Sequence, residues 1–258
     1  MSAALTDLGG GFHHIRGSLR IGGLLNVGTH CALVEIEPDR FIFLDSYELD
    51  RDTHTEILDR TQDGKLVEAI VNLHPFHTLH VEWMHRAFPR AKLYGTERHH
   101  DKFPDLPWEQ QTCEAAELPD LFAPNLEFSV PQGVAMVCDS EHVHFSSILA
   151  YHPASGTLFV DDTLSRVDLP GPLGILPMSN RLDFHPTLAR ALRPEAGAAD
   201  AFREWVMEIG VRWADSKRIA MAHNTVLDLS SGRDLPRLLG EALGRVKPVL
   251  DRHRERYG

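Results

Sequence analysis

The chain has 258 residues, of which 43% are hydrophobic, and a formal net charge of −11 at pH 7. This length suffices to bury a large core, and we expect a single domain spanning residues 1–258. The negative charge disfavours binding to nucleic acid or to an anionic membrane, since both would repel an acidic protein. A small-molecule substrate or ligand is the expected partner, and the composition is compatible with a homo-oligomer.

The cysteines and the apolar segments indicate the cellular setting. Cys31, Cys113 and Cys138 are widely spaced and form no CxxC pair, so neither a thiolate metal site nor a disulfide framework is expected. No run approaches the about 20 apolar residues that a membrane-spanning helix needs, and residues 1–17 lack the apolar core of a signal peptide. We therefore expect a cytoplasmic protein in a reducing compartment, with no membrane contact.

The first half of the sequence alternates between strand and helix patterns. Strands are predicted over 12–20, 31–36, 40–44, 66–73 and 91–94, and helices over 50–62 and from His80 to Phe88, before Pro89. This βαβαβ order predicts a sheet covered by helices. Four prolines interrupt the segment 96–124, where we expect loops and short helices.

The second half begins with short strand patterns and ends with helix patterns. Strands are predicted over 126–130, 134–138, 142–151 and 158–160, followed by a Pro/Gly-rich passage over 169–180. A helix over 199–214, a strand over 218–222 and an amphipathic helix over 235–252 complete the chain. Since no linker separates the halves, they predict one α/β (α+β) fold, a four-layer αββα sandwich.

Three histidines follow the predicted apolar strand 66–73 and precede the next helix. They are His74, His77 and His80, in the segment NLHPFHTLH. Side chains at such a strand-to-helix junction project from a fixed backbone, which suits a metal or catalytic site. Nine further histidines are interpreted as surface or packing residues: His13, His14, His54, His85, His99, His100, His152, His185 and His253.

The segment NLHPFH, followed by FPRAKLY, resembles the HxHxDH motif of the metallo-β-lactamase superfamily. In the register that fits best, Asn72 and His74 stand at the first two histidine positions, Phe76 at the aspartate and His77 at the last histidine. A second register, with one inserted residue, places His74, His77 and His80 at the three histidines and Leu79 at the aspartate. Both registers lose the aspartate.

Three further segments are similar to superfamily motifs, in the same order along the chain. Asp45 follows the strand RFIFL, as an aspartate does in the early "lvDtG" motif. The segment EHVHFSSILAYHPASGTLFVDDTL resembles "GHTpGSvvl…g.llftGD.l", which sets Ser147 and Asp162 at the serine and the metal-bridging aspartate. IAMAHN is similar to "vlpGHG" and places His223 at the last histidine ligand. Asp45 is expected to orient the backbone or a ligand without touching metal.

The resemblance implies a metallo-β-lactamase-type fold and a metal-dependent hydrolase. One divalent transition metal is expected to activate water near His77 and Asp162, with zinc as the first choice and iron or manganese as alternatives. The implied ligands are His74, His77, His142 or His144, Asp162 and His223. Because phenylalanine has no donor atom for a metal, two metals are not expected. The alternative is a metal-free member of the fold that binds a small molecule or a partner protein.

Overall fold

The computed structural model describes residues 4–18, 20–21, 25–26, 28–138, 140, 143–166, 181–222, 226–229 and 232–258. The chain divides into two compact units. The first comprises Met1–Phe128 and Ala150–Thr157, and the second comprises Ser129–Leu149 and Leu158–Gly258. Over the described ranges, no helix combines the length and the hydrophobicity that crossing a bilayer requires.

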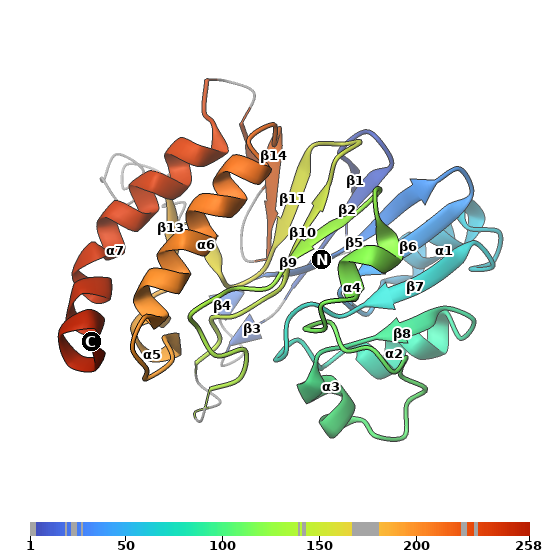
Figure 1. The fold of residues 1–258 in the computed structure, drawn as a ribbon. Coiled ribbons are helices and arrows are strands. Elements are labelled where there is room, and N and C mark those ends of the chain that lie inside the picture. The colour runs from blue at the N-terminus through green and yellow to red at the C-terminus, as the bar shows by residue number, and fades with distance from the viewer. Residues whose placement is uncertain are drawn as a thin grey trace. The chain divides into compact units, whose positions relative to one another are not determined.

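A six-stranded sheet with the order β1-β2-β5-β6-β7-β8 forms the centre of the first unit (Figure 1). Strands β1, β2, β5 and β6 are antiparallel neighbours, whereas β6, β7 and β8 run parallel. The carboxyl ends of β6, β7 and β8 therefore meet at one edge of the sheet, where the candidate site begins. The strands are β1 (Ala4–Asp7), β2 (Phe12–Gly17), β5 (Thr29–Glu37), β6 (Arg40–Leu44), β7 (Val67–Val71) and β8 (Lys92–Tyr94), and a small hairpin joins β3 (Arg20–Ile21) to β4 (Leu25–Asn26).

Two helices connect the parallel strands, as the sequence predicts. Helix α1 (Arg51–Arg60) follows β6, and the Asp50 carboxylate caps it by accepting the Thr53 N–H at 2.9 Å. Helix α2 (Val81–Ala87) follows β7 and ends at Phe88, just before Pro89. Both helices pack on the apolar face of the sheet, where they bury Ile57, Met84 and Phe88 with Phe43, Ile70 and Leu93. This burial is the main source of stability of the unit.

The rest of the first unit consists of short elements. The segment 96–124 contains loops and the short helices α3 (Glu97–Lys102) and α4 (Leu118–Phe122), as expected from its prolines. Strands β9 (Glu127–Ser129) and β10 (Leu149–His152), which lie mainly in this unit, are neighbours in a further sheet.

The second unit combines short strands with two long helices. Its strands β11 (Thr157–Val160), β14 (Arg218–Met221) and β15 (Leu227–Asp228) lie in the order β15-β14-β11, and β12 (Leu164–Arg166) pairs with β13 (Leu182–Phe184). Helix α5 (Leu188–Ala191) precedes the long helices α6 (Ala198–Arg212) and α7 (Leu235–Tyr257), which lie side by side (Figure 1). Phe202 of α6 packs against Phe145 and Phe184, with ring centroids 5.9 and 5.1 Å apart.

Two strands predicted in the second half are wrong. The segment 134–138 forms only one isolated bridge, between Val134 and Leu192, and the Ser146 hydroxyl donates to the Ala135 carbonyl oxygen at 2.7 Å. In the segment 142–151 only the end is a strand, β10, which begins at Leu149. The Pro/Gly-rich passage 169–180 lies entirely outside the described residues. Strand β1 was not predicted.

Candidate metal centre

The loop that carries the candidate ligands begins at the carboxyl end of β7, between the ends of β6 and β8. Asp45 follows β6 directly and has a left-handed backbone with a φ of 57°. Its Oδ1 accepts the Leu73 N–H at 2.7 Å, and its own N–H donates to the Val71 carbonyl oxygen at 2.8 Å. Asp45 is buried and orients the start of the loop, which is the role that the sequence predicts for it.

Asn72 joins the three parallel strand ends through its side chain. Its Oδ1 accepts the Ser46 hydroxyl at 2.7 Å, and its Nδ2 donates to the Tyr94 carbonyl oxygen at 3.0 Å. The same carbonyl accepts the Asn72 backbone N–H at 2.9 Å. The residue is fully buried, so these bonds replace water entirely. The amide oxygen that could have bound a metal is therefore already engaged by Ser46.

His74 and His77 form a stacked pair of imidazoles. Their ring centroids lie 4.1 Å apart with an interplanar angle of 17°. One ligand nitrogen of each ring lies within 4.8 Å of the other, and the Asp45 carboxylate has an oxygen within 4.8 Å of a His77 nitrogen. His74 is buried, and its Nδ1 accepts the Phe76 N–H at 3.1 Å. Ligation through His74 Nδ1 would exchange that hydrogen bond for a metal bond.

The donor set in the first unit fits part of a metal site. Two imidazoles and a nearby carboxylate are the ligand types that zinc prefers, and a catalytic zinc needs three protein ligands and an open position. Asp45 accepts the Leu73 N–H through Oδ1 alone, so the first unit offers ligand atoms from His74, His77 and the Asp45 carboxylate.

Phe76 occupies the position of the lost aspartate and is covered by a cation. The guanidinium of Arg98, from α3, lies 4.5 Å from the centre of its ring. Such a cation–π contact stabilises the pair by about 0.5–1 kcal/mol at a partly exposed position. A positive charge next to the cluster also disfavours a second cation there.

Helix α3 holds the loop through contacts that the sequence analysis missed. His99 is buried, and its Nδ1 accepts the Thr96 N–H at 3.2 Å, so its Nε2 carries the hydrogen that faces the His77 carbonyl oxygen at 3.5 Å. Burial lowers the pKa of His99 to about 3, which keeps it neutral. Lys102 Nζ donates to the Thr78 hydroxyl at 2.6 Å. The T-x-x-H spacing of Thr96 and His99, which forms a capping box, is the signal that could have revealed this role.

His80 packs against Tyr47 and not against the His74–His77 pair. Its ring lies edge-on to Tyr47 with centroids 4.9 Å apart, and burial lowers its pKa. The preceding Leu79 is 74% exposed and so points to solvent. This placement supports the register in which Asn72, His74 and His77 take the histidine positions.

In the second unit, the two acidic residues after β11 are buried in a hydrogen-bonded turn. Asp161 and Asp162 precede Thr163, whose hydroxyl lies 2.9 Å from the Ser147 hydroxyl and accepts the Ser147 N–H at 3.0 Å. These bonds fix the turn against the segment that contains half-buried His144. His142 and His223 lie outside the described residues.

Comparisons with known proteins identify the fold. No protein-family model and no curated protein matches the chain. Among solved structures, it is similar to the metallo-β-lactamase FIM-1 from Pseudomonas aeruginosa in its mono-zinc form, with a TM-score of 0.62, 15% identity and coverage of 95% of this chain and 96% of that one. DIM-1 metallo-β-lactamase exposed to ceftazidime has a TM-score of 0.59 and 16% identity, with coverage of 94% of this chain and 98% of that one. A metallo-β-lactamase from Erythrobacter litoralis with β-mercaptoethanol in its active site has a TM-score of 0.59 and 17% identity, with coverage of 93% and 97%. The chain thus has the αββα fold of the metallo-β-lactamases, as its sequence motifs indicate.

Proposed function

We propose that this chain, a member of the metallo-β-lactamase fold, is a metal-dependent hydrolase-like protein that holds one divalent metal. The observation that carries this proposal is the stacked pair His74 and His77, which lies at the carboxyl edge of parallel strands with ligand nitrogens within 4.8 Å of one another. The mono-zinc form of FIM-1 is a precedent for a single metal in this fold. Zinc is the first choice, and iron or manganese are alternatives.

The remaining ligands are assigned from the order of the sequence motifs. Asp162 follows β11 at the position of the superfamily's metal-bridging aspartate, and His144 or His142 and His223 stand at histidine positions. Together with His74 and His77 they supply the three or more donors that a catalytic site needs. A bound divalent metal lowers the pKa of its water so that hydroxide is available near neutral pH.

The protein's own groups act in this scheme by holding the donors in place. Asp45 fixes the backbone at Leu73, and His99 faces the His77 carbonyl oxygen, so both restrict the loop between His74 and His77. Restricting the loop keeps the two imidazoles close without a metal, which lowers the cost of ordering them on binding. Asp162 and His77 are the residues to which we assign the direct catalytic role, in the hydrolysis of a small-molecule substrate.

Metal content of protein purified without chelator tests the proposal. We expect about one metal ion per chain in the parent protein and its loss in His77→Ala and Asp162→Ala. The matched control is His80→Ala, since His80 belongs to the same loop but packs on Tyr47. A parent protein without metal under all growth conditions, or equal metal content in all the variants, would contradict the proposal. Hydrolysis of ester, lactam, thioester and phosphodiester probes then defines the substrate class.

A second function, metal-free binding of a small molecule or partner, is favoured by two observations. The Asn72 oxygen is engaged by Ser46, and Phe76 is covered by Arg98. This alternative predicts that zinc or manganese leaves the melting temperature unchanged, whereas a metal that binds the folded state must raise it. Thermal unfolding with and without each metal separates the two functions.

A further inference from the structure

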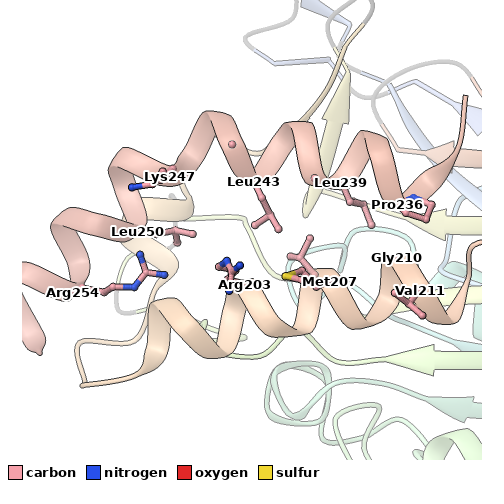
Figure 2. Close-up of a pocket in the computed structure, with 13 residues that line it drawn as sticks. Arg203, Met207, Gly210, Val211, Pro236, Leu239, Leu243, Lys247, Leu250 and Arg254 are labelled. Atoms are coloured by element: carbon pink, nitrogen blue, oxygen red, sulfur yellow. The ribbon is translucent and has the colours of Figure 1, made fainter.

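Helices α6 and α7 enclose an apolar groove in the second unit. Its volume is about 520 Å³. Figure 2 shows the two helices side by side, with the lining side chains between them and Lys247 and Arg254 toward one end. Val206, Met207 and Val211 of α6 and Leu239, Leu243 and Leu250 of α7 supply its apolar surface. The groove is an open recess between two helices, large enough to receive a row of side chains.

Glycines keep the groove open. Gly240 and Gly244 line it from α7, and a Cβ atom added at either position would meet no atom within 4 Å. An alanine would therefore be accommodated at either position without a clash inside the chain. Glycine lowers the stability of a helix interior relative to alanine, so these two glycines, one turn apart, make α7 less stable. They also deepen the recess.

A ridge of protruding side chains runs beside the groove. Arg203, Met207 and Val211 are spaced four residues apart on α6, so they form one row along the helix. Met207 is 50% exposed and Val211 is 76% exposed. Large apolar side chains that protrude next to an apolar recess are typical of an interaction surface.

We propose that this face is an interface between two copies of the chain, in which the ridge of each copy enters the groove of the other. In a two-fold dimer the same patch serves both partners, so the patch must be complementary to itself. A ridge and a groove that lie side by side meet this condition, because rotation about an axis between them places each ridge over the opposite groove. This inference is independent of the metal site.

The charges on this face match a second copy. A second row of α6, formed by Glu204, Glu208 and Arg212, runs beside the ridge, and a shallow hollow is lined by both rows. Lys247 lies across the groove, on α7. The same rotation brings the acidic row of one copy toward Lys247 of the other copy. Within its own chain, Lys247 pairs with Asp251. The charged residues that line the groove, Arg203, Lys247 and Arg254, are all basic, so the acidic row of a second copy complements them.

The molar mass of the full chain, measured by light scattering after size-exclusion chromatography, tests the interface. We expect twice the chain mass for the parent protein and a shift to the monomer in Val211→Glu. Gly244→Gln fills the groove without adding charge and should also give the monomer. Leu121→Glu is the matched control, because Leu121 is 47% exposed but lies on α4 in the first unit, and it should remain a dimer. Circular dichroism establishes that each variant is folded.

A charge exchange tests the orientation. Lys247→Glu should weaken the dimer about tenfold, and the double variant Lys247→Glu with Glu208→Lys should recover most of that loss. A monomeric parent protein at every concentration, or a dimer that persists in both Val211→Glu and Gly244→Gln, would overturn the proposal. A double variant as weak as Lys247→Glu alone would overturn the orientation.

Discussion

The Ser46 hydroxyl donates a 2.7 Å hydrogen bond to the side-chain oxygen of Asn72, and both residues are buried. Asn72 also donates through its side chain to the Tyr94 carbonyl oxygen. The position that resembles the first histidine of the superfamily motif is therefore a connector between the ends of three parallel strands. Its contribution to stability does not depend on metal.

Asn72→Ala should lower the free energy of unfolding by about 2–3 kcal/mol, because it leaves the buried Ser46 hydroxyl without this acceptor and removes one donor to Tyr94. Urea unfolding in the presence of a chelator measures the loss. Asn125→Ala is the control: Asn125 bonds to Glu37 in exposed surroundings, so a change within about 0.5 kcal/mol is expected. Equal stabilities of the two variants would rule out the connector role.

Phe76→Asp should increase the affinity for zinc about tenfold or more, if His74 and His77 bind metal as proposed. The substitution restores a carboxylate at the position where the motif has one, and carboxylates bind divalent cations. Arg98 lies against the Phe76 ring and would pair with the new carboxylate, so adding Arg98→Ala should increase the gain. Calorimetric titration measures the affinities. Phe76→Asn, which adds no charge, serves as the control, and a zinc affinity that is the same in all these variants would refute the ligand assignment.

His99→Ala should weaken metal binding about 10–100-fold, although His99 is not itself a proposed ligand. Its ring bonds Thr96 and faces the His77 carbonyl oxygen, so its loss frees the loop that holds His77, and residues that orient ligands have effects of this size. His100→Ala is the control, because the His100 ring stacks on Trp108 at 5.0 Å. Hydrogen exchange of the amides of residues 74–78 should rise in His99→Ala alone. Unchanged exchange would show that His99 does not position the loop.

The sequence predicts the first unit better than the second because its signals there are local. Strand β6 has its predicted bounds at Arg40 and Leu44, and Asp50 caps α1 at the predicted start. The segment 134–138 has an equally apolar pattern, but its backbone bonds to Ser146, so a tertiary contact overrides the strand propensity.

In the candidate site, too, the sequence predicts the residues that are close together in the chain and misses the contacts between distant ones. His74 and His77 are visible in the sequence because they are neighbours in a motif. The partner of Asn72 is 26 residues away, and the contact of His99 with His77 spans 22 residues, so neither follows from local spacing. The sequence identifies the loss of the histidine at Asn72, whereas only the fold shows what the amide does there.

Glu114 should make the first unit less stable as the pH rises through neutrality. Burial raises the pKa of its carboxyl to about 7, against 4.5 for the ordinary group, while both oxygens face the Glu97 N–H at 3.2 Å. Between pH 4.5 and pH 7 the folded state binds more protons at this group than the unfolded state does, so stability falls with increasing pH. The stabilising contribution is complete below pH 4.5 and is lost above pH 7.

Glu114→Gln removes this titration and keeps one acceptor for the Glu97 N–H. The melting temperature of the variant should exceed that of the parent protein at pH 8, and the difference should shrink toward pH 5, since the parent carboxyl is then protonated in the folded state. Glu255→Gln, at an exposed position of α7, should show no such trend. If the difference in melting temperature between the parent and Glu114→Gln stays constant from pH 5 to pH 8, the Glu114 carboxyl titrates alike in the folded and unfolded chains. Burial would then not govern its ionisation.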